Sequence, residues 1–270
     1  MQEILKRKKV AILYICTGKY SIFWKEFFDS AEKLFLQNLY KHYFVFTDDE
    51  SLKKEYQNYN NISFIHQKHL GWPYDTLKRF HMFSMIINDL EMFDYIFFIN
   101  ANTEILQKIG EEILPNYSEE IVACQHPGYF DKKRNKFPYE KNKRSKAYIG
   151  KNSGTHYFAG GFNGGTNISY IKLITTLKKY IDEDLAKNII ATWHDESYIN
   201  KYLANYSYIK IIDPGYLYPE GWDLPFEKKI VVKNKENYGG HNLLRDISNK
   251  KSKYYNINLL WEFLRKLLRQ

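Results

Sequence analysis

Two acidic residues stand side by side in the stretch Trp193-His194-Asp195-Glu196-Ser197. An indole, an imidazole and two carboxylates within five residues concentrate groups that can take part in catalysis. Successive side chains point in different directions, so Asp195 and Glu196 do not form a dyad that shares one proton. The same residues also fit the start of a helix over 196–203, with Asp195 as its N-cap. The pattern predicts a catalytic carboxylate or a capped helix start, and the two are compatible.

A second polar cluster, Asn100-Ala101-Asn102, directly follows the apolar run of residues 95–99. The run is rich in β-branched and aromatic residues, which predicts a buried strand. Asn100 and Asn102 then lie at the carboxyl end of this strand with their side chains on the same side. Ligands of open α/β sheets bind at that end of the strands, so we expect a binding site here. An Asx turn that ends the strand is the alternative.

A third stretch, residues 157–165, is rich in small residues, which let a backbone approach a ligand closely. These small residues are Ala159, Gly160, Gly161, Gly164 and Gly165.

Strands and helices alternate along the chain, and they must position these groups. Apolar runs predict strands over 10–15, 42–46, 62–65, 95–99, 121–125 and 230–232. Helical periodicity predicts helices over 21–35, over 75–90 with Asp75 or Thr76 as N-cap, and over 167–182. The alternation predicts an α/β fold of one domain, with a mostly parallel central sheet flanked by helices.

The composition excludes several classes of protein. A chain of 270 residues with 44% hydrophobic residues can bury one large core. The net charge of +9 favours an acidic partner, which could be a nucleotide, a nucleic acid or an anionic membrane. No nucleic-acid-binding signature appears, so we expect no nucleic-acid partner. Cys16 and Cys124 lie in apolar runs and are expected to be buried and reduced.

Several stretches together resemble glycosyltransferase family 6, which contains the histo-blood-group A and B transferases and the α1,3-galactosyltransferases. Besides residues 95–102 they are AILYICTGKYSIFW (11–24), GWPYDTLKRF (71–80), HPGY (126–129), YFAGGFNGGT (157–166), WHDESYINKY (193–202) and YPEGW (218–222). They occur in family order. The resemblance implies a GT-A fold over residues 1–245, a UDP-sugar donor and α1,3 transfer with retention. Residues 246–270 lie beyond it as a basic amphipathic tail.

One departure from the family pattern concerns metal. Vertebrate members carry Asp-x-Asp, which binds Mn²⁺ or Mg²⁺, where this chain has Asn100-Ala101-Asn102. Hard divalent cations prefer carboxylate oxygens to amides. Bacterial members resemble this sequence and do not depend on metal, so we expect no metal site and no cofactor. Arg245 and Lys233 are then candidate phosphate partners. The lysine-rich insertion 131–149 is expected to resist compaction, either closing over the donor or staying solvated.

The resemblance also assigns roles to single residues. Glu196 matches the catalytic glutamate, which stabilises an oxocarbenium-like transition state or attacks to form a covalent intermediate. The implied donor-binding residues are Ile15, Thr17, Tyr20, Arg79, Asn100, Ala101, Asn102, Ala159, Gly160, Gly161, Asp195 and Arg245. The implied acceptor-binding residues are His126, Trp193, His194, Trp222 and Asp223.

The size of two residues bears on the donor sugar. The family positions that match Ala159 and Gly161 face C2 of this sugar, and small residues there admit an N-acetyl group. We therefore expect UDP-GalNAc as donor, with UDP-Gal as the alternative, because a roomy site discriminates weakly against a smaller sugar. The expected reaction adds GalNAc to O3 of an α1,2-fucosylated galactose, giving an A-antigen-like glycan. A carbohydrate-binding protein without turnover is the alternative class, and the intact WHDES stretch argues against it.

The two ends of the chain suggest a location. The chain begins at the catalytic domain, without the N-terminal anchor of vertebrate members, so we expect a cytoplasmic bacterial enzyme. Residues 251–270 combine one apolar helical face with a basic one, as interfacial membrane helices do. This pattern predicts peripheral contact with the inner membrane, or packing on the core or on a second subunit.

Overall fold

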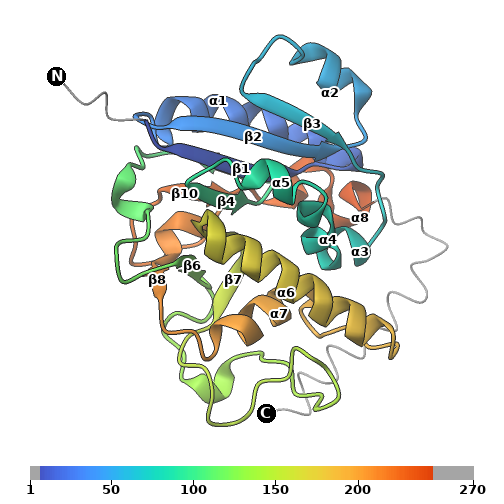
Figure 1. Cartoon of the computed structure of the whole chain (residues 1–270), viewed down its shortest axis with the longest axis vertical. Coiled ribbons are helices and arrows are strands. Elements are labelled where there is room, and N and C mark those ends of the chain that lie inside the picture. The colour runs from blue at the N-terminus through green and yellow to red at the C-terminus, as the bar shows by residue number, and fades with distance from the viewer. Residues whose placement is uncertain (1–6, 246–270) are drawn as a thin grey trace.

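Seven strands form the central sheet of the computed structural model, which describes residues 7–245 (Figure 1). Their order is β3-β2-β1-β4-β7-β6-β8. They are β1 (Lys9–Ile15), β2 (Tyr40–Thr47), β3 (Ile62–His66), β4 (Tyr95–Ile99), β6 (Ile121–Gln125), β7 (Phe158–Thr166) and β8 (Ile209–Ile212). Neighbouring strands are parallel except that β7 runs antiparallel to both β4 and β6. The predicted α/β class with a mostly parallel sheet is confirmed.

Shorter elements surround this sheet. A second sheet contains β5 (Thr103–Ile105), β10 (Ile230–Val232) and β9 (Tyr218–Pro219). The α-helices are α1 (Trp24–Leu34), α2 (Glu50–Glu55), α3 (Tyr74–Leu77), α4 (Arg79–Ser84), α5 (Ile87–Leu90), α6 (Asn167–Leu185), α7 (His194–Leu203) and α8 (Gly240–Leu244). Five 3₁₀ segments are η1 (Gly18–Phe23), η2 (Glu111–Ile113), η3 (Arg134–Lys136), η4 (Pro214–Leu217) and η5 (Lys235–Tyr238).

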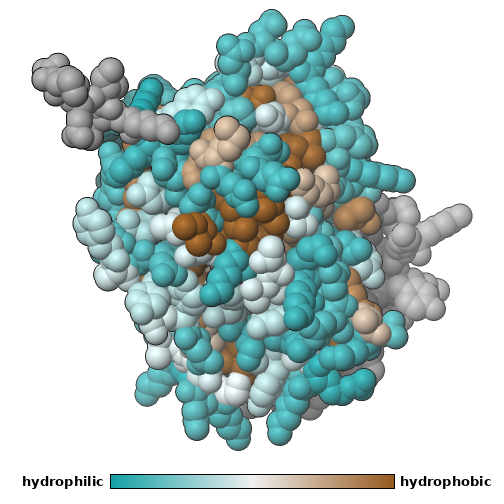
Figure 2. Space-filling view, viewed as in Figure 1, coloured by the Kyte–Doolittle hydropathy of each residue, from teal (hydrophilic) through white to brown (hydrophobic). Residues whose placement is uncertain are grey.

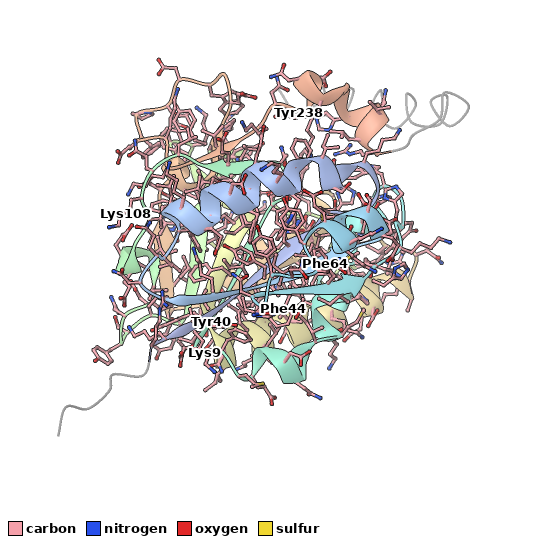
Figure 3. All side chains as sticks on the ribbon, turned by 90° about the horizontal axis from the view of Figure 1, so that it is seen from above. Lys9, Tyr40, Phe44, Phe64, Lys108 and Tyr238 are labelled. Carbon is pink, nitrogen blue, oxygen red and sulfur yellow. The ribbon has the colours of Figure 1, made fainter. Side chains whose placement is uncertain are left out.

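The two faces of the central sheet bury separate apolar clusters, because strand side chains alternate between faces. Helix α1 covers one face, where Trp24 and Phe27 pack against Tyr14 of β1. Helices α4, α6 and α7 cover the other face. Figure 3 labels one residue from each side of the sheet. Phe64 packs against the apolar cluster under α1, and Phe44 belongs to the cluster on the opposite face.

The single helix predicted over 75–90 is wrong, because the structure has three short helices, α3, α4 and α5. The backbone departs from helical geometry at Lys78 and Ile86. In α4, four of six residues are buried, which is more than the single stripe of a straight surface helix can bury. Asp75 is not an N-cap, because its carboxylate accepts the Leu70 N–H at 2.7 Å instead.

The helix predicted over 21–35 begins later and has a different start. The chain leaves β1 and forms the 3₁₀ segment η1, and the α-helix begins only at Trp24. Gly18 lies in the left-handed region at φ 58°, and its N–H donates to Asp48 Oδ1 at 2.7 Å. Residues 18–20 are therefore held as an ordered turn at the carboxyl end of β1.

The expectation that the lysine-rich insertion resists compaction is wrong. Two buried carboxylates hold its backbone. Asp184 of α6 accepts the Lys146 N–H at 2.8 Å and the Ser145 hydroxyl at 2.5 Å. Glu140 accepts the N–H of Asn142 and of Thr192, each at 2.7 Å. The backbone is thus anchored, while most of the lysines of the insertion remain exposed.

Three smaller observations complete the fold. Cys16 and Cys124 are buried and free, as predicted. None of the helices within residues 7–245 is long and apolar enough to cross a membrane. Figure 2 shows apolar surface near the middle of the face that carries α5, where Phe44, Ile86 and Phe93 line a shallow groove.

Candidate active site

The main candidate site is a pocket at the carboxyl ends of β1 and β4. The strand order 3-2-1-4 reverses direction between these strands, which is where open α/β sheets bind ligands. The pocket encloses about 610 Å³, part of it open to solvent. Its lining consists of Ile15, Thr17, Tyr20, His69, Trp72, Asp75, Thr76, Arg79, Phe98, Asn100, Ala101, Lys235 and Arg245. Seven of the predicted donor-binding residues are in this list: Ile15, Thr17, Tyr20, Arg79, Asn100, Ala101 and Arg245.

The two asparagines after β4 lie on the same side, as predicted, but they have different surroundings. Asn100 Nδ2 donates to Asn102 Oδ1 at 2.7 Å. Asn102 Nδ2 donates to the Lys233 carbonyl at 2.8 Å, and this residue is buried. Asn100 and Ala101 line the pocket, whereas Asn102 is not among the residues lining it and supports Asn100.

This pair of amides does not suit a hard divalent cation. Mg²⁺ and Mn²⁺ are bound through carboxylate oxygens, and here the amide groups are joined to each other and to a backbone carbonyl. Within residues 7–245 no three His, Cys, Asp or Glu side chains gather where they could hold a metal ion. We derive no step through a metal.

Two positively charged residues near the end of the described chain, Lys235 and Arg245, line the pocket. The Arg245 guanidinium lies 3.6 Å from the centre of the Trp72 ring, and Lys235 Nζ lies 5.1 Å from the centre of the Tyr20 ring. Burial, and then the nearby charge of Arg245, lower the pKa of Lys235 to about 8. An anion in the pocket would oppose this shift.

The prediction that Lys233 is a phosphate partner is wrong. Its Nζ pairs with Glu104 and lies 3.4 Å from Glu26, outside the pocket lining. Lys235, two residues later, lines the pocket in its place.

Two carboxylates lie at the start of α7, beside the pocket. The helix begins at His194, one residue before the predicted cap, so Asp195 and Glu196 belong to its first turn. Asp195 is therefore not an N-cap. Its Oδ2 lies 3.0 Å from Arg79 Nη1, and both side chains are buried. Burial raises the pKa of Asp195 to about 6, although the Arg79 charge opposes this.

Glu196 is held by two hydrogen bonds. Its Oε1 accepts the Tyr157 hydroxyl at 2.6 Å, and its Oε2 accepts the Gly160 N–H at 2.8 Å. Burial raises the pKa of Glu196, while these two bonds and the Arg79 charge lower it again. The result is a carboxylate fixed in position in a desolvated place.

Gly160 joins the two groups. Its N–H donates to Glu196, and its carbonyl accepts from Arg79 Nη1 at 2.5 Å and from Asn163 Nδ2 at 3.1 Å. Arg79 Nη1 therefore lies next to both this carbonyl and Asp195 Oδ2, so one guanidinium connects the start of β7 with the start of α7.

Strand β7 brings its small residues beside the pocket because it is antiparallel, but Ala159, Gly160 and Gly161 are not among the residues that line it. Its first half lies beside the carboxyl end of β4, with Asn100 N–H donating to the Gly161 carbonyl at 2.9 Å. A Cβ on Gly161 would lie 3.1 Å from Leu217 Cδ2 and 3.5 Å from Asn100 Cβ.

Two other glycines of this stretch serve the sheet and not a ligand, contrary to the prediction. A Cβ on Gly164 would collide with Phe97 and the Ile96 carbonyl, and one on Gly165 with the Glu120 carbonyl. These positions are small because neighbouring strands fill the space beside them.

The predicted acceptor residues are only partly brought together. His126 Nδ1 accepts the Gly128 N–H at 3.0 Å, and burial lowers the pKa of His126 to about 4, so its ring is neutral. A Cβ on Gly128 would lie within 4 Å of both His126 and Trp222, which places these rings around one glycine. Asp223 is exposed.

Trp193 and His194 lie at the start of α7. The His194 ring meets Trp72 edge to face, with ring centroids 4.6 Å apart. Burial, and then the Arg245 charge, lower the pKa of His194 to about 4. His194 therefore contacts Trp72, which lines the pocket, but does not line it itself. The Trp193 Nε1–H is buried without a partner within residues 7–245.

Sequence reasoning missed several residues at the site. His69, Trp72, Asp75, Thr76, Phe98 and Lys235 line the pocket. Four of them belong to or adjoin the GWPYDT motif, which was the available signal. Tyr157 was part of the glycine-rich stretch, but nothing in the sequence paired it with Glu196.

Comparison with known proteins agrees with this geometry. The family model for glycosyltransferase family 6 matches residues 2–246. The O-antigen biosynthesis glycosyltransferase WbnI of Escherichia coli is 34% identical over 229 residues, covering 84% of this chain and 95% of the relative. Histo-blood group ABO system transferase 1 of Rattus norvegicus is 28% identical, covering 87% of this chain and 68% of the relative. Globoside alpha-1,3-N-acetylgalactosaminyltransferase 1 of Mus musculus is 28% identical, covering 82% and 64%.

The central sheet with flanking helices is consistent with the GT-A-like fold expected from this family. A family match over nearly the whole chain, together with a pocket at the switch point of the sheet, identifies an enzyme that transfers a sugar from a nucleotide-sugar donor to a glycan acceptor. The chain belongs to glycosyltransferase family 6.

Proposed function

We propose that this enzyme transfers GalNAc from UDP-GalNAc, with retention and without metal, to O3 of an α1,2-fucosylated galactose. One observation carries the proposal. The Gly160 peptide joins the buried carboxylate of Glu196 to Arg79, and Arg79 lines the nucleotide pocket. The pocket and the carboxylate thus form one continuous site, with the small residues of β7 between them.

The uridine would occupy the part of the pocket at the end of β1. Tyr20 offers an aromatic face for the base, and Thr17 and Asp75 offer polar groups for it and for the ribose. Asp75 is fixed there by the Leu70 N–H, and its second oxygen lies 3.1 Å from His69 Nδ1.

The diphosphate would lie against Lys235 and Arg245. Both line the pocket, and burial, followed by the charge of Arg245, lowers the pKa of Lys235, a shift that an anion would oppose. A guanidinium binds phosphate oxygens in a fork, while a lysine acts as a point charge. Together with Arg79 they supply the charge that a metal ion supplies where carboxylates are present.

The transferred sugar would then lie between β7 and α7. Ala159 and Gly161 leave space beside its C2, which favours an N-acetyl group. Glu196, in its ionised form, stabilises positive charge at C1 as the bond from C1 to the diphosphate oxygen breaks. The acceptor O3 forms the new bond to C1, and its proton passes to the released UDP.

The acceptor would lie against His126 and Trp222. The neutral His126 ring and the half-exposed indole of Trp222 offer a hydrogen-bonding group and an apolar plate for a galactose. We place the reaction in the bacterial cytoplasm. The amphipathic segment 251–270, for which the sequence predicts membrane contact or packing on the core or on a second subunit, lies outside the described residues.

The test is transfer to 2′-fucosyllactose from UDP-GalNAc and, separately, from UDP-Gal, in excess EDTA and then with Mn²⁺. GalNAc transfer in EDTA that Mn²⁺ does not increase is the expected result. Activity that requires Mn²⁺ would refute metal independence, and a preference for UDP-Gal would refute the donor assignment. The Glu196→Gln variant should lose transfer and still bind UDP; an active variant would reject the catalytic role.

A further inference from the structure

We propose that Tyr157 is a positioning residue for the reaction, and that its hydroxyl orients the Glu196 carboxylate and keeps it ionised. This inference rests on the proposed catalytic role of Glu196. Tyr157 precedes β7, is only 2% exposed, and donates its hydroxyl to Glu196 Oε1 at 2.6 Å. A charge-assisted hydrogen bond of this length is among the stronger kinds in proteins.

Both oxygens of the Glu196 carboxylate accept a hydrogen bond, and Tyr157 supplies the one from a side chain. The Gly160 N–H, which is fixed by the strand, supplies the one on Oε2. With one donor on each oxygen, the plane of the carboxylate is set and its rotation is blocked. Without the hydroxyl, the Gly160 N–H would be the one hydrogen bond left on the carboxylate from within residues 7–245.

The lysine-rich insertion holds Tyr157 in place. The Tyr157 ring contacts Phe137 and Tyr139 of the insertion, with centroids 6.1 and 5.6 Å apart. It also contacts Tyr129 at 5.1 Å and His126 at 5.6 Å. The insertion therefore acts as a buttress for the catalytic carboxylate, and this role needs no closing movement.

The insertion is itself secured around Tyr139. The Tyr139 hydroxyl donates to the His156 carbonyl at 2.5 Å, directly before Tyr157 in the chain. Arg134 lies 5.4 Å from the Tyr139 ring centre and donates to the Ser153 and Gly150 carbonyls. Tyr139 thus contributes to the same cluster as Tyr157 but does not touch Glu196.

The charge of Glu196 depends on several groups. Burial favours the neutral acid, and the Tyr157 hydroxyl, the Gly160 N–H and the positive charge of Arg79 favour the anion. Asp195 on the same helix and Tyr129 across the cluster also interact electrostatically with it. Loss of the Tyr157 hydroxyl removes a group that favours the anion, so the pKa of Glu196 must rise. As the pH falls, activity that needs the Glu196 anion would then be lost at a higher pH than in the unaltered enzyme.

The test compares Tyr157→Phe with the matched control Tyr139→Phe. Each removes one hydroxyl from the same aromatic cluster and retains the ring. A hydrogen bond to a charged group is worth enough that Tyr157→Phe should lower kcat about ten- to hundredfold, with UDP affinity nearly unchanged. The acid limb of its pH–rate profile should move to higher pH. Tyr139→Phe loses the hydrogen bond to the His156 carbonyl but keeps the contact between Tyr157 and Glu196, so kcat should fall less and the acid limb should stay in place.

Three results would overturn the inference: a wild-type kcat and pH profile in Tyr157→Phe, an equal loss in Tyr139→Phe, or a Tyr157→Phe loss that appears only in UDP affinity. The Glu196→Gln variant separates the two proposals. If it stays active, the catalytic role of Glu196 fails; if it is inactive while Tyr157→Phe is normal, only the role of Tyr157 fails. Should Tyr157→Phe not fold, 3-fluorotyrosine at position 157 keeps the contact with a stronger donor, and must move the acid limb to lower pH.

Discussion

Lys235 and Lys233 form a natural pair for testing how the enzyme binds its donor. Lys235 lines the pocket, whereas Lys233 pairs with Glu104 and Glu26. Replacing Lys235 by alanine should remove a charge-assisted contact with the diphosphate. Such contacts are worth about 1.5–3 kcal/mol, which corresponds to roughly 10–150-fold weaker binding. Lys233→Ala should leave donor affinity within about twofold.

The pH dependence of this affinity gives a second and independent measure. The pKa of Lys235 is lowered to about 8, and an anionic ligand favours the charged form. Donor affinity should therefore be constant below about pH 8 and fall above it, by at most about tenfold per pH unit. In Lys235→Ala this fall should disappear. Lys235→Arg should also abolish it while keeping the charge, because a guanidinium does not titrate in this range.

The assay is calorimetric titration with UDP-GalNAc in the absence of acceptor, from pH 7 to pH 9. Ionisation of the uracil ring affects all the variants alike, so the difference between wild type and Lys235→Ala isolates the lysine. Equal weakening in Lys233→Ala and Lys235→Ala, or a fall above pH 8 that persists in Lys235→Ala, would refute the placement of the diphosphate.

Two further predictions concern metal and donor choice. Converting Asn100 and Asn102 together to aspartate should lower activity in EDTA, since an anion at residue 100 then lines the pocket with a second anion directly behind it, and Mn²⁺ should restore activity; an unchanged rate in EDTA would contradict this. Gly161→Ala should lower the ratio of kcat/KM for UDP-GalNAc over UDP-Gal by about 10–200-fold. The reason is that Leu217 leaves the new methyl group no room to move away from the sugar. An unchanged ratio would mean that residue 161 does not face the sugar.

Much of the sheet and of the pocket could be predicted from the sequence. Strands over 10–15, 42–46 and 95–99 each lie within an observed strand, since continuous apolar runs are a direct mark of buried strands. Asn100 was placed at the carboxyl end of its strand, where it lines the pocket. These features depend on residues that are neighbours in the sequence, and such local patterns form the expected elements in the folded chain.

Features that depend on distant contacts could not be predicted. The difference between Lys233 and Lys235 is set by Glu26 and Glu104, which are far away in the sequence. The insertion was judged by its lysines, but its packing is decided by the buried carboxylates of Glu140 and Asp184. The density of charge along a segment does not reveal a buried carboxylate that accepts hydrogen bonds from the backbone of that segment.

The hydrogen bonds of the Gly160 peptide limit how this enzyme can acquire a new donor. Its N–H orients Glu196, its carbonyl holds Arg79, and a Cβ on it would lie 3.3 Å from both Asp195 Oδ2 and Glu196 Cβ. A side chain at residue 160 would therefore change selectivity only by disturbing the reactive groups at the same time. Residues 159 and 161 carry no such contacts with Glu196. A library that seeks new sugar donors should vary these two positions and keep residue 160 as glycine.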